Sequence, residues 1–250
     1  MMTKNSFLIV LSQKTVLGIF LIGKILRFVF FVIFLFFIIT GSKTLAGYNI
    51  NQGIFFFVSY MLVDVISQFL YREVYRFRPL VVSGDFDLVL VKPTSSLFRV
   101  LAGGADIIDF ITIPPLIFAV YFVGRMLAPS ITEVFYYLIL ILNALVIATA
   151  FHIIVLSLGI ITLEIDHTIM IYRDLTSLGR FPIDIYKEPL RSALLYILPI
   201  GVMMTIPAKT MMGFVSVGGV ILSLFAGVLL IILALNFWKF ALKRYTSASS

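Results

Sequence analysis

Cysteine is absent from this sequence and charged residues are scarce. None of the 250 residues is cysteine, and Asp, Glu, Lys and Arg together make up 12% of the chain, against about 25% in a typical soluble domain. The absence of cysteine excludes a secreted scaffold held together by disulfides. The shortage of charge excludes a soluble enzyme and a disordered regulator, because too few polar side chains remain to cover a surface that faces water.

Several signatures of chemistry are missing as well. The sequence has no G-x-x-x-x-G-K-[ST] phosphate-binding loop, no H-E-x-x-H motif, no Cys/His cluster and no G-x-S-x-G turn, which argues against a membrane enzyme. The two histidines, His152 and His167, fall on different expected elements, and we interpret His152 as a core residue. We therefore expect no metal site and no cofactor bound by this chain.

What the sequence has in abundance is long hydrophobic runs. Hydrophobic residues make up 61% of the chain, and stretches free of charge cover residues 28–42, 44–63, 110–124, 134–163, 192–208 and 210–238. A helix needs about 20 mostly apolar residues to cross a bilayer. The runs predict an all-α membrane protein with six transmembrane helices, near 27–47, 53–72, 105–126, 132–163, 189–207 and 215–238.

The basic residues predict an orientation. Sixteen of the 19 Lys and Arg residues fall in the N-terminal segment, the 73–104 loop with its adjoining helix end, the 164–191 loop and the C-terminal segment, and only Lys43, Arg125 and Lys209 fall on the other side. Lys and Arg are enriched in cytoplasmic segments. Both termini and both long loops are therefore expected in the cytoplasm. Because the basic residues alternate with the hydrophobic runs, they do not indicate a nucleic-acid surface.

Two further short helices are expected near the membrane surfaces. Residues 5–24 suit a helix in the interface, with Lys14 and Lys24 reaching toward water, although an unstructured tail is the alternative. This interfacial segment is expected over residues 1–26. The run 210–238 is longer than one crossing needs, so residues near 208–216 are expected to form a small outer helix.

The 73–104 loop contains a candidate docking helix between Pro79 and Pro93. Ser83 precedes Asp85 and Asp87, and a serine cap with acidic residues in the first turn favours a helix start. Leu88, Val89 and Leu90 provide an apolar face. The helix is expected either to dock a partner or to rest on the lipid surface.

Other polar residues interrupt the hydrophobic pattern. Asp64 lies midway along the second expected span, close to Ser67 and Gln68. A carboxyl group inside a membrane is a candidate for ion-coupled transport, and hydrogen bonding within the structure is the alternative that we favour. The 164–188 loop is expected to be a cytoplasmic connector.

Four segments, taken in order, resemble the permeases of type-2 ABC exporters, and most closely a short-chain group without a large extracellular domain. They are S-G-D-F-D-L-V-L-V-K-P at 83–93, R-F-P-I-D-I-Y at 180–186, the L-P-I…P-A turn at 198–208 and W-K-F-A-L-K-R-Y at 238–245. The resemblance covers nearly the whole chain. Residues 162–166 depart from it, because related sequences often carry a Trp-containing stretch there.

The resemblance implies one transmembrane domain over residues 1–250, with a coupling helix after the second span, in a bacterial cytoplasmic membrane. It implies a second permease subunit, identical or related, and separate P-loop ATPase subunits that bind ATP and Mg²⁺, so this chain is not itself an enzyme. The implied coupling residues are Ser83, Gly84, Asp85, Asp87, Lys92 and Pro93. The cytoplasmic family-like segment comprises Arg180, Phe181, Pro182, Asp184 and Tyr186. The transported substrate is not implied.

Overall fold

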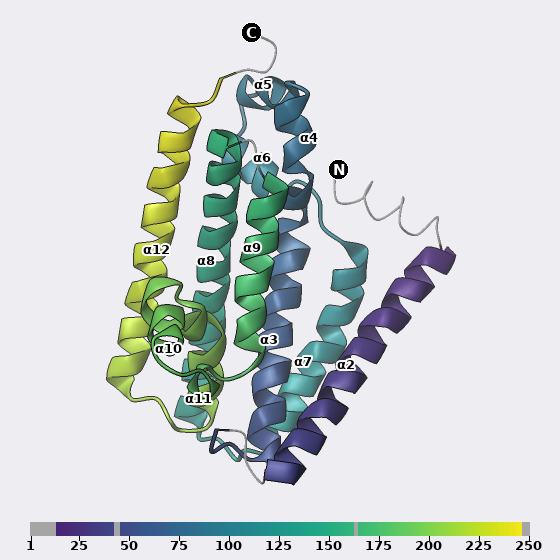
Figure 1. Cartoon of the computed structure of the whole chain (residues 1–250), viewed down its shortest axis with the longest axis vertical. Coiled ribbons are helices and arrows are strands. Elements are labelled where there is room, and N and C mark those ends of the chain that lie inside the picture. The colour runs from purple at the N-terminus through teal and green to yellow at the C-terminus, as the bar shows by residue number, and fades with distance from the viewer. Residues whose placement is uncertain (1–13, 43–45, 163–164, 247–250) are drawn as a thin grey trace.

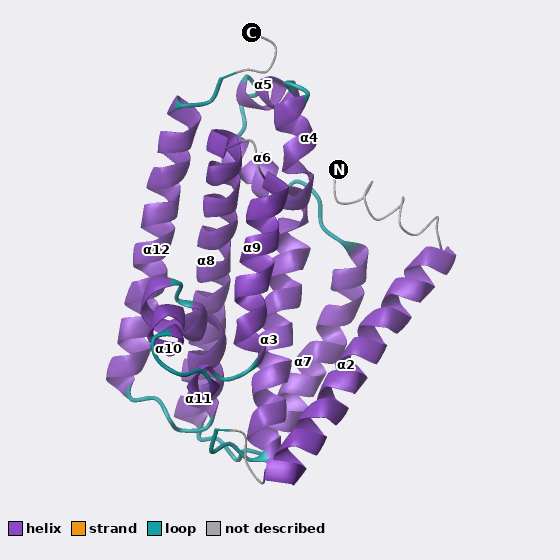
Figure 2. Ribbon diagram, in the orientation of Figure 1, coloured by secondary structure: helices purple, strands orange, loops and turns teal. Residues whose placement is uncertain are grey.

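The computed structural model describes residues 14–42, 46–162 and 165–246, and these fold into a bundle of helices with no strand (Figure 2). The expected all-α class is therefore confirmed for the described residues. The longest helices run roughly along the long axis of the molecule (Figure 1). They are α2 (Lys14–Ser42), α3 (Ile50–Tyr71), α7 (Ile107–Arg125), α8 (Ile131–Thr162) and α12 (Val217–Lys243).

Five helices are long and apolar enough to cross a membrane, and a bent pair of shorter helices raises the possible number to six. The five correspond to the spans expected near 27–47, 53–72, 105–126, 132–163 and 215–238. Many of their large apolar side chains are exposed, such as Phe37 on α2 and Phe225 on α12. A bundle embedded in lipid needs no polar cover on these faces, so the chain is a multi-pass membrane protein.

Helix α2 differs from the expectation for the N-terminus. Residues 14–26 do not form a separate interfacial helix, because α2 continues unbroken from Lys14 to Ser42. Residues 1–13 lie outside the described part of the chain. The helix packs on α3 through stacked rings, and the centroids of Phe31 and Phe57 are 4.0 Å apart.

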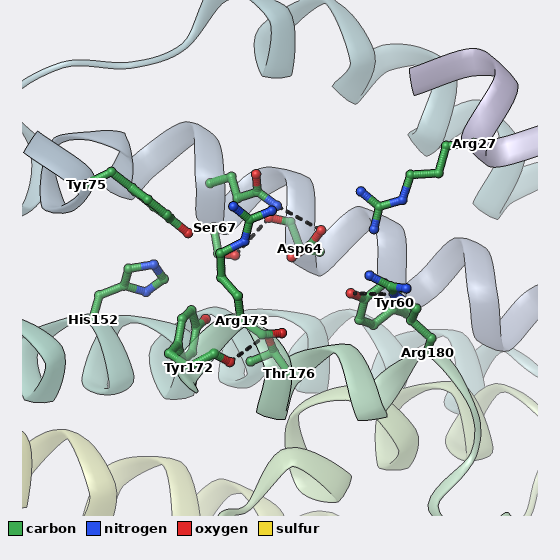
Figure 3. Close-up of a pocket in the computed structure, with 11 residues that line it drawn as sticks. Arg27, Tyr60, Asp64, Ser67, Tyr75, His152, Tyr172, Arg173, Thr176 and Arg180 are labelled. Atoms are coloured by element: carbon green, nitrogen blue, oxygen red, sulfur yellow. Dashed lines mark hydrogen bonds between the residues drawn. The ribbon is translucent and has the colours of Figure 1, made fainter. Parts of the chain in front are cut away.

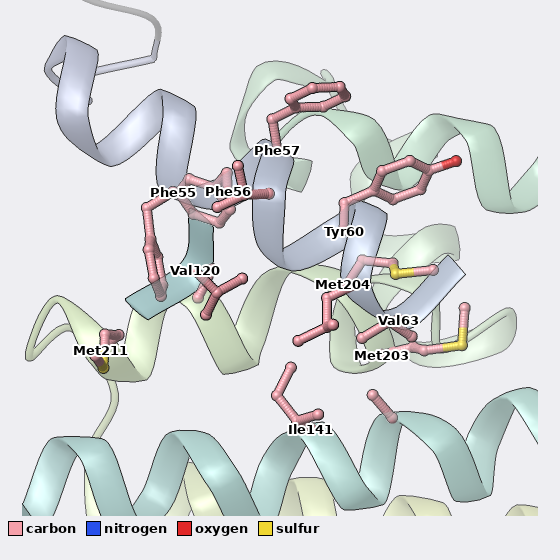
Figure 4. Close-up of a cluster of buried hydrophobic side chains, with 14 of the residues drawn as sticks. Phe55, Phe56, Phe57, Tyr60, Val63, Val120, Ile141, Met203, Met204 and Met211 are labelled. Atoms are coloured by element: carbon pink, nitrogen blue, oxygen red, sulfur yellow. The ribbon is translucent and has the colours of Figure 1, made fainter. Parts of the chain in front are cut away.

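Helix α3 is the centre of the bundle. Its first turn is held by a reciprocal cap, in which Asn49 accepts from the Gln52 backbone and the Gln52 side chain accepts from the Asn49 backbone. From there the helix buries most of its apolar side chains, including Phe55 (Figure 4). Aromatic and methionine side chains from α3 and the 201–211 segment fill this core, so α3 is fixed on several sides.

Helices α8 and α12 pack side by side along the edge of the bundle. The buried side chain of Asn143 on α8 donates to the Ser223 carbonyl on α12 at 2.8 Å. Gly227 on α12 faces the same asparagine, and a Cβ at this position would collide with the Asn143 side-chain oxygen. A small residue therefore allows a buried hydrogen bond between two membrane helices.

The fifth crossing corrects the sequence analysis. The 164–188 segment was expected as a cytoplasmic loop, but α9 (Ile165–Ser177) folds back along α8 and α3 into the bundle (Figure 1). It continues through the short turns η2 (Leu178–Arg180) and η3 (Ile183–Ile185). Asp184 then meets Lys209, which the sequence analysis had placed on the opposite side, with Oδ2 and Nζ 2.7 Å apart. Residues 165–184 therefore run from one end of the bundle to the other.

The expected fifth span near 189–207 is a bent, re-entrant segment instead. It consists of α10 (Leu190–Ser192), the π-helical segments η4 (Ala193–Ile197) and η5 (Gly201–Thr205), and α11 (Ile206–Met211). The two halves, 190–197 and 201–211, meet at 80°. Arg191 and Lys209 both pair with Asp184, so the two ends of the segment lie at the same end of the bundle. The outer helix expected near 208–216 corresponds to α11, which ends at Met211.

The other end of the bundle carries four short helices. They are η1 (Arg72–Arg76), α4 (Phe77–Val82), α5 (Asp85–Leu90) and α6 (Ser96–Ala102). The start of α2 and the end of α12 lie at or toward this end (Figure 1). The first described residues of α2 and the last of α12 thus lie toward one end of the bundle. Without the four basic residues of the 164–191 segment, twelve basic residues remain on this side, and Lys187 and Arg191 join Lys43, Arg125 and Lys209 to make five at the other end.

Candidate functional site

The 83–93 segment forms a short helical arm at the end of the bundle where α12 ends. Its helix, α5, is shorter than expected, and its cap is Gly84 in the left-handed conformation, with φ 80°, rather than Ser83. Ser83 donates to the Asp85 carboxylate at 2.8 Å instead. Asp85 and Asp87 lie in the first turn, as expected, whereas Lys92 and Pro93 follow the helix.

Aromatic contacts hold α5 in place. The ring of Phe86 is fully buried, and it contacts Phe77 and Tyr245 edge-on, with centroids 5.1 and 5.2 Å away. Burial and the nearby Asp87 carboxylate together raise the pKa of Tyr245 to about 12. Tyr245, in the segment after α12, therefore packs against the buried face of α5, and the opposite face of α5 stays exposed.

The apolar face of α5 also differs from the expectation. Phe86 and Val89 point into the protein, whereas Leu88 is 60% exposed and Val91 is 79% exposed. Val82, at the end of α4, is exposed as well. Exposed apolar side chains on a compact arm are typical of a surface that binds another protein.

The 180–186 segment lies within the bundle. Arg180 Nε is 3.5 Å from the Tyr60 hydroxyl, and the Tyr186 hydroxyl donates to the Leu178 carbonyl at 2.8 Å. Phe181 packs against Phe31 of α2, with centroids 5.5 Å apart. Pro182 is buried, and Asp184 accepts from the Tyr48 hydroxyl at 2.8 Å. These contacts hold the irregular backbone of this segment inside the bundle.

Asp64, Ser67 and Gln68 line one cavity, as Figure 3 shows. Gln68 Nε2 donates to Asp64 Oδ2 at 2.9 Å, and the Ser67 hydroxyl donates to the Asp64 carbonyl at 2.9 Å. The favoured interpretation of Asp64 as a hydrogen-bonded residue agrees with these contacts. Asp64 lies seven residues before Tyr71, the last residue of α3, which is about 10 Å along the helix axis.

The meeting of three basic residues around Asp64 was not predicted from the sequence. Arg27 from α2, Arg173 from α9 and Arg180 from η2 direct their guanidinium groups toward the same cavity (Figure 3). Their spacing in the sequence gave no signal, because two of them were assigned to a cytoplasmic loop and Arg27 to the start of the first span. Only the folding back of α9 brings the three together.

His152 completes the cavity wall. It is buried, and its Nδ1 lies 2.7 Å from the Ala148 carbonyl one turn earlier, which identifies Nδ1 as the donor. Its ring lies between those of Tyr71 and Tyr172, with centroids 4.8 and 4.7 Å away. The interpretation as a core histidine agrees with these contacts, and the described residues contain no cluster of three potential metal ligands.

An apolar cleft adjoins the cavity between α2, α3 and α7. Arg27, Asp64 and Gln68 line both spaces, and the remaining wall of the cleft is mainly apolar. Lys24 stands at the cleft and pairs with Asp109 of α7. Asp109 lies in the first turn of α7, and its pairing with Lys24 ties α2 to α7.

A cavity lined by charged side chains inside a bundle of membrane helices is a candidate substrate or ion pathway. The model of one protein family, described as ABC-2 family transporter protein, matches residues 21–249 of the chain. The chain belongs to this family and is an ABC transporter permease, the membrane component of such a transporter and not its catalytic part. No curated protein and no solved structure gives a significant match.

Proposed function

We propose that the chain is the permease of an ATP-driven exporter, in which two permease subunits enclose the pathway and separate ATPase subunits bind ATP and Mg²⁺. Membership of the ABC-2 family supports the ATPase partners. The pathway is proposed to lie beside α9, and the ATPase subunits are proposed to dock on α5. The setting is a bacterial cytoplasmic membrane, with both termini in the cytoplasm.

The polar face of α9 is the observation that carries this proposal. Arg173 and Asp174 are exposed on it in the single chain, and Ser177 and Arg180 line the same open hollow. Charged side chains at membrane depth face protein or water rather than lipid. A second permease subunit facing α9 would enclose this surface and leave a polar path between the two.

The arm formed by α4 and α5 is the proposed coupling element. It lies outside the apolar part of the bundle, and its exposed Leu88 and Val91 offer a contact for the ATPase, with Asp85 and Lys92 as polar neighbours. Because α4 continues from α3 through η1, a force on the arm reaches the helix that lines the cavity. ATP-driven closure can bias the pathway only through contacts that differ between its states.

The test combines ATPase capture with transport. The full-length permease is co-expressed with the P-loop ATPase encoded beside it, and Leu88→Glu and Asp85→Lys are compared with wild type by pull-down. Both variants are expected to reduce ATPase capture while the permease inserts normally. Ile131→Glu is the matched control, since Ile131 is 90% exposed at the other end of the bundle. Unchanged capture by both variants would remove α5 as the coupling element.

The alternative function is ion- or proton-coupled transport through Asp64. Transport measured in reconstituted vesicles without an ion gradient distinguishes ATP-driven export from ion-coupled transport. Transport driven by ATP alone supports the exporter, whereas transport that needs a gradient and no ATP supports the alternative. Family membership favours the exporter.

A further inference from the structure

The cavity around Asp64 has an excess of positive charge. Three guanidinium groups, from Arg27, Arg173 and Arg180, face one carboxylate (Figure 3). Arg27 and Arg173 reach it from exposed positions on α2 and α9, whereas Asp64 belongs to the central helix α3. With Asp64 ionised the cluster carries two more positive charges than negative ones.

These guanidinium groups are incompletely satisfied. Within the described part of the chain, no ion pair within 4.0 Å joins any of the three to a carboxylate. The contact from Arg180 to Tyr60 is long, at 3.5 Å, and the Gln68 amide occupies Asp64 Oδ2. A charge without a partner is costly inside a protein bundle. The site is therefore suited to an anion that accepts hydrogen bonds from several of these guanidinium groups.

His152 supplies a second, independent sign of a ligand. Its side chain is 2% exposed and lines the cavity, but its Nε2 has no hydrogen-bond partner among the described residues. Because Nδ1 donates to the Ala148 carbonyl, Nε2 of the neutral ring is an acceptor. Buried polar atoms are normally satisfied, so a hydroxyl group or a water molecule is expected beside Nε2.

The adjoining apolar cleft fits a hydrocarbon chain. The empty space is about 840 Å³ in the cleft and about 370 Å³ in the polar cavity, and both volumes include space that is open to solvent. Phe28, Met61, Leu116 and Ala119 are among its walls. Thr112 and Ala119 lie five and twelve residues beyond the start of α7, or about 7 and 18 Å deeper. The cleft therefore extends from the charged site toward the middle of the bundle.

The two spaces together match one kind of molecule. We propose that the guanidinium groups of Arg27, Arg173 and Arg180 bind the anionic headgroup of an amphiphile, whose hydrocarbon chain occupies the cleft between α2, α3 and α7. The assignment of this molecule as the cargo rests on the proposed export function. The headgroup lies toward the α5 end and the chain points away from it, which is the orientation of a lipid in the leaflet on that side.

Binding is measured on the purified full-length permease in neutral-detergent micelles with decyl phosphate as the probe. Decanol lacks the anion, and inorganic phosphate lacks the chain. Decyl phosphate is expected to bind at least about tenfold more tightly than either. Arg27→Gln and Arg173→Gln should each weaken it about tenfold, since each removes a charge-assisted hydrogen bond. Ala119→Phe should weaken decyl phosphate and leave inorganic phosphate unchanged.

The matched control is Arg125→Gln, at the far end of α7, which should leave the affinity unchanged. Equal binding of decanol would reduce the site to an apolar cleft, and equal binding of inorganic phosphate would reduce it to a free-anion site. Either result overturns the proposal, as does unaltered affinity in folded Arg27→Gln and Arg173→Gln. Because the assay contains no ATPase, failed binding with intact ATPase capture would reject the cargo class alone. The reverse pattern would reject the exporter alone.

Discussion

The carboxylate of Asp184 lies 2.7 Å from the ammonium group of Lys209, at the end of the bundle opposite α5. The same carboxylate accepts from Arg191 and from the Tyr48 hydroxyl, each at 2.8 Å. One side chain therefore joins the start of the re-entrant segment, its end and the residues before α3. This junction fixes both ends of a segment that bends by 80°.

Replacing Asp184 should destabilise the permease. Asp184→Asn removes the charge while keeping the shape, so the Lys209 and Arg191 cations lose their shared partner. We expect a loss of about 1.5–3 kcal/mol, the range for hydrogen bonds to charged groups, seen as a lower unfolding temperature in detergent. Asp174→Asn, at an exposed position, should have no effect, and an unchanged Asp184→Asn protein would show that the junction is dispensable.

Single cysteines can test the fifth crossing, because the chain has none of its own. Lys187 is exposed near Asp184, so Lys187→Cys should react from the same side as Met126→Cys. Ser83→Cys should react from the other side only. The measurement uses an impermeant maleimide on intact cells and on inverted vesicles. Labelling of residues 187 and 83 from the same side would restore the cytoplasmic loop that the sequence analysis expected.

Gly227 should be intolerant of any side chain. Gly227→Ala places a methyl group against the Asn143 oxygen, and overpacking typically costs about 1–3 kcal/mol. Thermal unfolding should show this loss, and Asn143→Ala in the same chain should recover part of it. Gly218→Ala is the matched control on α12, because its nearest neighbour would be 3.8 Å away. Equal stability of the two alanine variants would contradict the close approach of α8 and α12.

The proposed pairing of permeases predicts a cross-link at α9. Met170 is 61% exposed on this helix. Met170→Cys should form a disulfide-linked dimer on mild oxidation in the membrane. Ile221→Cys, 62% exposed on α12, should not, since α12 is expected to face lipid. Disulfide-linked dimers at position 221 and none at position 170 would place the subunit interface on α12 and contradict the proposed pairing through α9.

Asp64→Asn should retain ATP-driven transport, because asparagine keeps an oxygen that can accept from Gln68. It should also strengthen binding of decyl phosphate several-fold, because one negative charge beside the proposed anion is removed. Transport and binding are measured on the same preparation. Lost transport with normal expression and assembly would favour the ion-coupled alternative.

The length of the charge-free hydrophobic runs was sufficient to predict five of the spans. α8, for example, carries no charge between Glu133 and its end at Thr162, so its extent follows from the sequence. The acidic first turn of α5 was also predicted, because acidic residues favour helix starts. These features depend on neighbours in the sequence.

The crossing at residues 165–184 could not be predicted in this way. Its charges, including Arg173 and Arg180, led to the expectation of a loop, and only packing against α3 and α8 places it in the bundle. The cavity was missed for the same reason, because Arg27 and Arg173 belong to helices that meet only in the folded chain. Sites assembled from distant segments leave no local pattern.

The polarity of the fifth crossing has a consequence for biogenesis. Residues 165–184 contain five charged side chains, those of Asp166, Arg173, Asp174, Arg180 and Asp184, and each costs about 2.5–3.5 kcal/mol near the centre of an inserting helix. The insertion machinery would therefore leave this stretch outside the lipid when it first emerges. It must enter the bilayer late, after α3 and α8 provide a polar surface and Lys209 can meet Asp184. Membrane integration and tertiary folding are thus a single event for this part of the chain.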